Sequence, residues 1–418
     1  MISKKIYHND LFDFMKCYYN IFPESSITNF ILISKKVIAI LLLVLYISIQ
    51  IFILKLIKKR KNLSDGKKFI DKCLNSSFIK NNYFIQESPI ISVIIPAYNC
   101  EKTILFPLIS IQNQNIYNFE IILINDFSQD NTSEILQRFQ KKDKRLKIIN
   151  NKKNMGTLYS RCIATLISKG EYIFALDNDD MIFGEDILDY TYKQAKKYDH
   201  DIVGFKAISV KSYSDNIRKM KDLEKYSYEN NLIIKQPELS TWIISINGKF
   251  KPHDVTLWGK IIKTKIYIKA INLLGKQRYS IYMSWAEDTS MNFIIFNIAE
   301  SFIFIHKYGI LHLISTSTAS SLQPINNKFF GILFLLDIIY DFSKNNEEKI
   351  YSVYAALYIM KYYYKDKHYI NKNNLSYLKT IIYKIKKSKY ISDKNKNIVL
   401  KEFQKFFFES NYNELKIF

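Results

Sequence analysis

The chain has 418 residues, 48% of them hydrophobic, which is ample for a buried core and longer than one compact core usually is. It carries 61 Lys and Arg against 39 Asp and Glu, a formal net charge of +22. The lysines are scattered, and no zinc-finger spacing, basic heptad region or aromatic RNA-binding box occurs, so we expect no nucleic-acid partner. No Gly-x-Gly-x-x-Gly or Walker-type loop is present either, which removes the Rossmann and P-loop classes.

An uncharged apolar run fills residues 37–54 and reads VIAILLLVLYISIQIFIL. Extended to Ile57 by a snorkelling Lys55, it reaches the ~20 residues that a helix needs to cross a bilayer. The run is too long and too far from the N-terminus for a cleaved signal peptide. We therefore predict an N-terminal segment at 1–36 and one transmembrane anchor at 37–57, in a single-pass membrane protein. A buried core helix is the alternative.

The side of the membrane that carries the bulk of the chain stays open. Basic residues are denser after the apolar run than before it, and by the positive-inside rule this places the bulk in the cytosol. Glycosylation acceptor sequences at Asn62 and Asn75 would instead suit a lumenal face in the ER or Golgi. We expect the polar residues 58–88 to form a stem.

From residue 89 onwards, short apolar runs alternate with helical stretches. The runs are Ile90–Ile95, Phe119–Ile124, Leu146–Ile149 and Tyr172–Leu176, with a further one at Asp201–Phe205. The helical stretches between the first four are Thr103–Gln112, Thr132–Lys141 and Gly156–Ser168. This alternation predicts βαβ units and an α/β fold with a mostly parallel sheet flanked by helices.

Polar loops follow the first four predicted strands, and the carboxyl ends of strands in such a sheet form its ligand-binding edge. The fourth loop, Asp177–Asp180, holds three carboxylates in four residues, which suits a hard cation such as Mg²⁺ or Mn²⁺. Asp126 and Arg161 could contact a base, ribose or phosphate, so the edge suits a nucleoside diphosphate. Taken singly, each has a plainer interpretation. The loop Asp177–Asp180 could be only an acidic turn, Asp126 a turn former or helix cap, and Arg161 a solvent-facing helix residue.

Five motifs in this region resemble, in order, those of family-2 glycosyltransferases. They are Ser92–Asn99 (SVIIPAYN), Asn125–Thr132 (NDFSQDNT), Asn154–Gly156 with Arg161, Gly170–Tyr172 and Leu176–Asp180 (LDNDD). The resemblance is close from Pro89 to Phe205 and looser to about Ser320. Two residues depart from the family pattern. Asn125 replaces the usual Asp, and Phe127 replaces the usual Gly, so we expect that loop to be less able to adopt a positive φ.

The resemblance implies a GT-A fold, a nucleotide-sugar donor, Mn²⁺ or Mg²⁺, and inversion at the anomeric carbon. It implies a nucleotide-sugar-binding half at 89–210 and an acceptor-binding half at 211–320. The metal-binding pair would be Asp177 and Asp179. The donor-binding residues would be Pro96, Ala97, Tyr98, Asn99, Asp126, Arg161 and Asp177.

Inversion in one displacement needs a general base within hydrogen-bond reach of the acceptor hydroxyl. Residues 285–289 (WAEDT) resemble the family's Glu-Asp motif, in which the Asp is the base. We therefore predict Asp288 as base and Glu287 as the next candidate, with a cap of the helix Thr289–Ile298 as the alternative. The acceptor-side residues are predicted to be His253, Asp254, Trp258 and Lys260. Two roles stay open for His312, contact with a phosphate and packing alone.

Together these features predict a membrane-anchored, metal-assisted inverting glycosyltransferase. Its donor would be a nucleotide-sugar, with a UDP-sugar favoured, and its acceptor a glycan, glycoprotein or lipid hydroxyl. Processive polysaccharide synthases of that family usually carry several membrane spans and a Gln-x-x-Arg-Trp segment. This chain has one apolar span and no such segment, which favours transfer of single sugars. The alternatives are a metal-dependent nucleotidyltransferase and a degenerate glycan- or nucleotide-binding module. Residues 321–418 are predicted to be a helical C-terminal region that caps the catalytic domain, with a location on a membrane surface as the alternative.

Overall fold

The computed structural model describes residues 88–210, 232–236, 245–246, 249–250, 256–283, 285–314 and 325–343, and isolated positions between 379 and 401. The chain divides into two compact units, 1–75 with 210–229 and 76–209 with 230–418. All described residues except one belong to the second unit. The predicted anchor at 37–57, most of the stem, and His253 and Asp254 lie outside the described residues. Among the helices within the described ranges, none is long and apolar enough to cross a bilayer.

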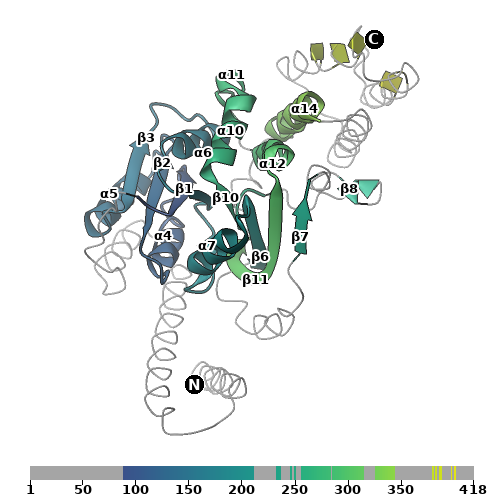
Figure 1. Ribbon diagram of the computed structural model, residues 1–418. Coiled ribbons are helices and arrows are strands. Elements are labelled where there is room, and N and C mark those ends of the chain that lie inside the picture. Colours follow the sequence, from purple (N-terminus) through teal and green to yellow (C-terminus); the bar gives the residue numbers. More distant parts are fainter. Residues whose placement is uncertain are drawn as a thin grey trace, which may run out of the picture. The chain divides into compact units, whose positions relative to one another are not determined.

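The first half of the described fold alternates parallel strands with helices (Figure 1). Its elements are β1 (Ile91–Ala97), α4 (Leu105–Gln112), β2 (Phe119–Asn125), α5 (Thr132–Lys142), β3 (Leu146–Asn150), α6 (Thr157–Leu166) and β4 (Tyr172–Ala175). β1 pairs in parallel with both β2 and β4, and β2 pairs in parallel with β3. The four predicted strands and three predicted helices are confirmed to within a few residues at each end.

The second half adds shorter strands and a layer of helices. Its elements are β5 (Met181–Ile182), α7 (Ile187–Tyr198), β6 (Ile202–Val210), β7 (Leu232–Lys235), β8 (Ser245–Ile246), β9 (Lys249–Phe250), β10 (Lys260–Lys263), α10 (Thr264–Leu274), α11 (Lys276–Tyr279), α12 (Glu287–Ile298), β11 (Ser301–Leu313) and α14 (Ile325–Phe342). The main sheet runs β3-β2-β1-β4-β10-β6-β11-β5, with β7 on β11. β10 is antiparallel to β4 and β6, so the sheet is mixed, with parallel pairing among the first four strands.

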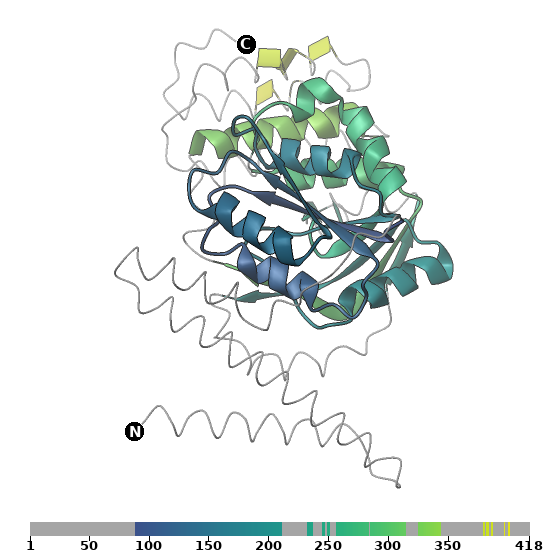
Figure 2. The same cartoon turned by 90° about the vertical axis from the view of Figure 1, so that its left-hand side faces the viewer.

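The direction of chain progression reverses across β1. β2 and β3 are added on one side of β1, whereas β4 lies on the other. Because βαβ crossovers are right-handed, this reversal sends α4 and α5 to one face of the sheet and α6 to the opposite face (Figure 2). Ligands bind at such a switch point, outside the carboxyl ends of the strands.

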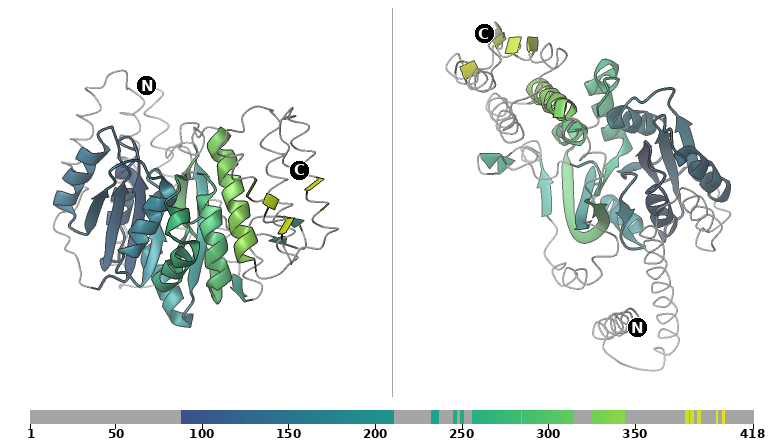
Figure 3. Two further views of the ribbon diagram at one scale, coloured as in Figure 1. Left: turned by 90° about the horizontal axis from the view of Figure 1, so that it is seen from above. Right: turned by 180° about the vertical axis from the view of Figure 1, so that it is seen from behind.

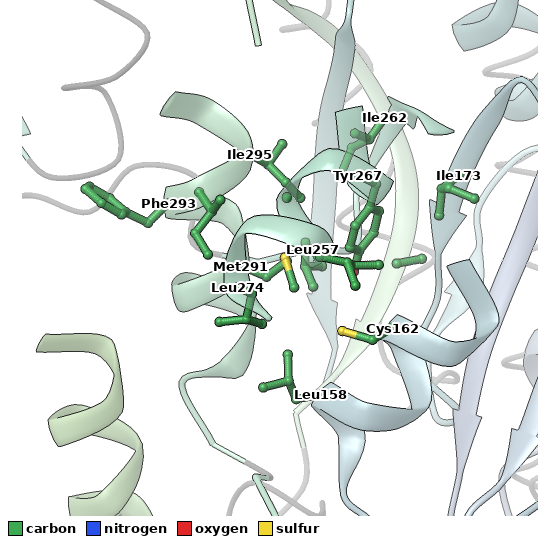
Figure 4. Close-up of a cluster of buried hydrophobic side chains, with 14 of the residues drawn as sticks. Leu158, Cys162, Ile173, Leu257, Ile262, Tyr267, Leu274, Met291, Phe293 and Ile295 are labelled. Carbon is green, nitrogen blue, oxygen red and sulfur yellow. The ribbon is translucent and has the colours of Figure 1, made fainter. Parts of the chain in front are cut away.

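A continuous apolar core joins the sheet to the helices on the α6 face. Helices α6, α10, α12 and α14 lie side by side there (Figure 3). Figure 4 shows side chains from three of them converging, with Cys162 on α6, Tyr267 on α10 and Met291 on α12. The packing fixes α6 relative to α12, and these two helices carry the charged residues described next.

Candidate active site

Arg161 lies in the middle of α6 and only 3% of it is exposed. Its Nη2 donates to Asp177 Oδ1 at 2.5 Å, and its Nη1 donates to Glu287 Oε1 at 3.4 Å and to Asp288 Oδ1. Burial opposes its charge, but the three carboxylates raise the pKa of Arg161 above its usual range, so the guanidinium stays protonated. One cation therefore joins the end of β4 to the first turn of α12. The solvent-facing reading of Arg161 is wrong.

Glu287 and Asp288 open helix α12. Burial, and next the charge of Asp288, raise the pKa of Glu287 to about 7. Burial also raises the pKa of Asp288, against the opposing effect of Arg161. The Asp288 side chain is 19% exposed and that of Glu287 11%, so Asp288 is the more open of the two.

The N-cap residue of α12 is Ala286, and no side chain caps the helix. Asp288 instead uses Oδ2 to accept a hydrogen bond from Leu257 N at 3.2 Å. The capping alternative for Asp288 is therefore wrong. A carboxylate in the first turn is still favoured by the helix dipole.

The carboxylates of the acidic cluster after β4 have different surroundings. Asp180 is buried and accepts hydrogen bonds from His312 Nδ1 at 3.0 Å and from Leu313 N at 3.1 Å, both on β11. Burial, followed by the charges of Asp177 and Asp180, raises the pKa of Asp179 to about 7. Like charges are thus crowded at the switch point of the sheet, while Asp180 serves to join the loop to β11.

His312 completes this corner of the site. Its ring stacks on Trp258 with 4.8 Å between centroids and 23° between planes. Although burial opposes its charge, Asp180 raises the pKa of His312. No local sequence pattern indicates these contacts, because His312 and Asp180 are 132 positions apart. The His312 ring therefore both packs against Trp258 and hydrogen-bonds to Asp180.

Asp126 is buried and organises the turn that begins α6. Its Oδ1 accepts from Asn151 Nδ2 at 2.7 Å and from Met155 N at 2.8 Å, and its Oδ2 accepts from Gly156 N at 2.8 Å. Gly156 has φ +87°, and an added Cβ would lie 2.5 Å from the Met283 carbonyl oxygen. Asp126 thereby fixes the turn from which α6 begins, and with it the position of Arg161 on that helix. Its contact with a donor base stays a prediction.

The other predicted donor residues lie at the ends of β1 and β2. Pro96 and Ala97 are buried in β1, and Pro96 O accepts from Asn178 Nδ2 at 2.9 Å, which ties the β4 loop to β1. Asn99 has φ +48° and Tyr98 is exposed. The loop containing Phe127 adopts a positive φ, +66°, despite the missing glycine, so the expectation for that loop is wrong.

Two of the four predicted acceptor-side residues fall within the described ranges. Trp258 forms a bridge with Ala175 of β4, which places it beside the acidic cluster. Lys260 is buried and donates to the Thr256 carbonyl. Within the described residues no group of three or more His, Cys, Asp or Glu is arranged as a ready metal site.

Part of the chain is similar in sequence to known glycosyltransferases. Residues 92–248 match the family model described as Glycosyl transferase family 2. "Glycosyltransferase GlyG" of Streptococcus pneumoniae is 34% identical over 116 residues, 28% of this chain. That match spans 38% of the relative's length. An "Uncharacterized glycosyltransferase" of Haemophilus influenzae is 43% identical over 97 residues, 23% of this chain and 30% of the relative.

The fold is also similar to that of Staphylococcus aureus TarS solved with UDP-GlcNAc. The TM-score is 0.52 at 16% identity, over 77% of this chain and 89% of that one. The described fold is thus of the GT-A type. Residues 92–248 match glycosyl transferase family 2, which is the family predicted from the motifs.

Proposed function

We propose that the protein transfers a sugar from a nucleoside diphosphate sugar, with a UDP-sugar favoured, to a hydroxyl group of a glycan, glycoprotein or lipid. One observation carries the proposal: Arg161 joins Asp177, at the switch point of the sheet, to Asp288, at the start of α12. A donor-side acid and a candidate base thus share one site. The likeness to TarS, which has been solved in complex with UDP and with UDP-GlcNAc, supports a uridine donor.

Asp288 would act as the general base. Its carboxylate takes the proton of the acceptor hydroxyl while that oxygen forms a bond to the anomeric carbon. The bond from this carbon to the diphosphate oxygen breaks on the opposite face, so the configuration inverts and a nucleoside diphosphate leaves. A base with a raised pKa accepts a proton more readily, and Arg161 keeps the carboxylate ionised beforehand.

The donor set after β4 fits a divalent cation. Mg²⁺ commonly binds one or two protein carboxylates together with substrate phosphates, so a ready cluster of three protein ligands is not required. Asp177 and Asp179 would hold Mn²⁺ or Mg²⁺, and Asp180 would keep the loop on β11. The cation would neutralise the charge of the leaving diphosphate.

The membrane part of the proposal rests on the sequence alone. We propose that the apolar run at 37–57 anchors the protein as a single span and keeps the catalytic unit near a membrane-bound acceptor. Glycosylation at Asn62 or Asn75 would place that unit on the lumenal side. Unmodified sites in a secretion-competent host would favour the cytosol.

The experiment uses the full-length chain in detergent with Mn²⁺ and a panel of nucleotide sugars. We expect release of the nucleoside diphosphate from at least one donor, and Asp288→Asn should lower it by about 10²-fold or more while leaving nucleotide binding intact. Asp189→Asn, a surface aspartate on α7 paired with Lys193, is the matched control. Full activity of Asp288→Asn would remove it as base. Release of pyrophosphate from a nucleoside triphosphate would indicate a nucleotidyltransferase instead.

A further inference from the structure

Phe127 combines two costly features in the loop after β2. Its φ is +66°, in the left-handed region that bulky side chains rarely occupy, and 46% of it is exposed. Glycine would adopt this backbone without strain. The phenylalanine therefore adds an exposed ring without the full benefit of burial in the core.

The strained backbone is held on both sides. Ser128 Oγ accepts from Asn99 N at 3.0 Å, and Asn99 Oδ1 accepts from Gln129 N at 2.8 Å. Ser128 N also donates to Asn125 Oδ1 at 3.2 Å, and Gln129 Nε2 donates to Phe127 O at 3.0 Å. The conformation is thus fixed by the loops after β1 and β2. A strained residue that its surroundings hold in place is a reason to look for a function.

Phe127 follows β2, on the side of β1 away from the strand β4 that precedes the acidic cluster. Ala97 and Asn125 are partners in the β1–β2 register, so Tyr98 and Phe127 follow the same edge of the sheet. β2 lies two strands from β4, a separation of about 10 Å at the usual strand spacing. A nucleoside diphosphate with its phosphates at Asp177 and Asp179 can extend over β1 and reach β2 with its base.

We propose that the Phe127 ring stacks on the base of the donor nucleotide, beside the exposed Tyr98. The inference rests on the proposed function and deepens it. Every base has a flat π-face, so stacking adds affinity for the nucleoside without choosing among bases. The phosphates are held elsewhere, and the ring should therefore not affect the binding of a free diphosphate.

The test measures binding of UDP and of pyrophosphate, each with Mn²⁺, to the full-length chain by calorimetry. Phe127→Gly and Phe127→Asn remove the ring but suit a positive φ, so the loop keeps its shape. We expect both to weaken UDP binding about tenfold and to leave pyrophosphate binding unchanged. Phe127→Trp should keep UDP binding. Tyr117→Ala is the matched control, an exposed aromatic residue before β2, at the opposite end of that strand.

Three results would overturn the inference in distinguishable ways. If the wild type binds UDP and the two ring-free variants bind it equally well, the stacking role is wrong while the proposed function stands. If UDP and pyrophosphate weaken together, Phe127 shapes the phosphate site and does not contact the base. If the wild type binds none of UDP, GDP, CDP and ADP, the proposed function fails first.

Discussion

Arg161 and Asp288 form a buried ion pair between helices α6 and α12, at positions 127 apart in the chain. Asp177 and Glu287 share the same guanidinium. Removal of one partner from a buried ion pair leaves uncompensated charge, which usually costs more than the pair contributes. The stability of the fold and the geometry of the site therefore depend on the same residue.

Replacing Arg161 with Met should destabilise the protein by about 3–5 kcal/mol, because three carboxylates lose their shared cation. Sugar transfer should fall as well. Urea unfolding measures the first effect and nucleoside diphosphate release the second. Arg138→Met, on the partly exposed face of α5 with Glu134 as its i,i+4 partner, is the matched control and should stay within about 0.5 kcal/mol of wild type. A stable and active Arg161→Met would contradict the central role of this residue.

Gly156→Ala should destabilise the protein more than Gly275→Ala. Both glycines have positive φ, but an added Cβ at Gly156 would lie 2.5 Å from Met283 O, whereas nothing lies within 4 Å at Gly275. Both have extended ψ, at 168° and 147°, so backbone strain of about 1–3 kcal/mol is common to both changes and the excess at Gly156 measures the clash. Thermal unfolding of the two variants provides the comparison. Equal losses would mean that the Gly156 turn can move away from Met283.

Gly331→Ala should lower stability although alanine favours helices by about 0.5–1 kcal/mol. Gly331 is within α14, and an added Cβ would lie 2.3 Å from the Trp285 carbonyl oxygen. The displaced segment precedes Glu287 and Asp288, so sugar transfer should fall too. Chemical unfolding and activity are both measured. A stabilised, fully active variant would show that α14 does not position the start of α12.

His200 should make the fold acid-sensitive. Among the described residues neither ring nitrogen has a hydrogen-bond partner, and burial, followed by the charge of Lys235, lowers the pKa of His200. The unfolded chain then binds the proton more readily than the fold does, so stability is full above the usual histidine pKa of about 6.5 and falls as pH drops below it.

His200→Phe, of similar shape, should flatten the stability profile between about pH 7 and 5, the range around the reference histidine pKa. Urea midpoints at several pH values measure this. If His200→Phe shows the same fall as wild type, other groups cause the acid sensitivity.

The sequence by itself determined the elements of the first half and their order. Apolar runs such as Phe119–Ile124 are local signals, because burial on both faces of a parallel strand needs uninterrupted hydrophobic residues. The acidic loop after Tyr172–Ala175 was predicted in the same way, from residue types at short spacing. The Glu-Asp pair at the start of α12 was predicted from its resemblance to the family motif. The family was predicted from these motifs in order.

Only the tertiary structure decided which charges meet. The sequence could not tell that Asp180 bonds to His312, that Asp126 holds the turn at Gly156, or that Phe127 adopts a positive φ. Such contacts join positions far apart in the chain. They depend on the side of β1 to which β4 is added and on how α6 packs against α12, and no local pattern of residues encodes either.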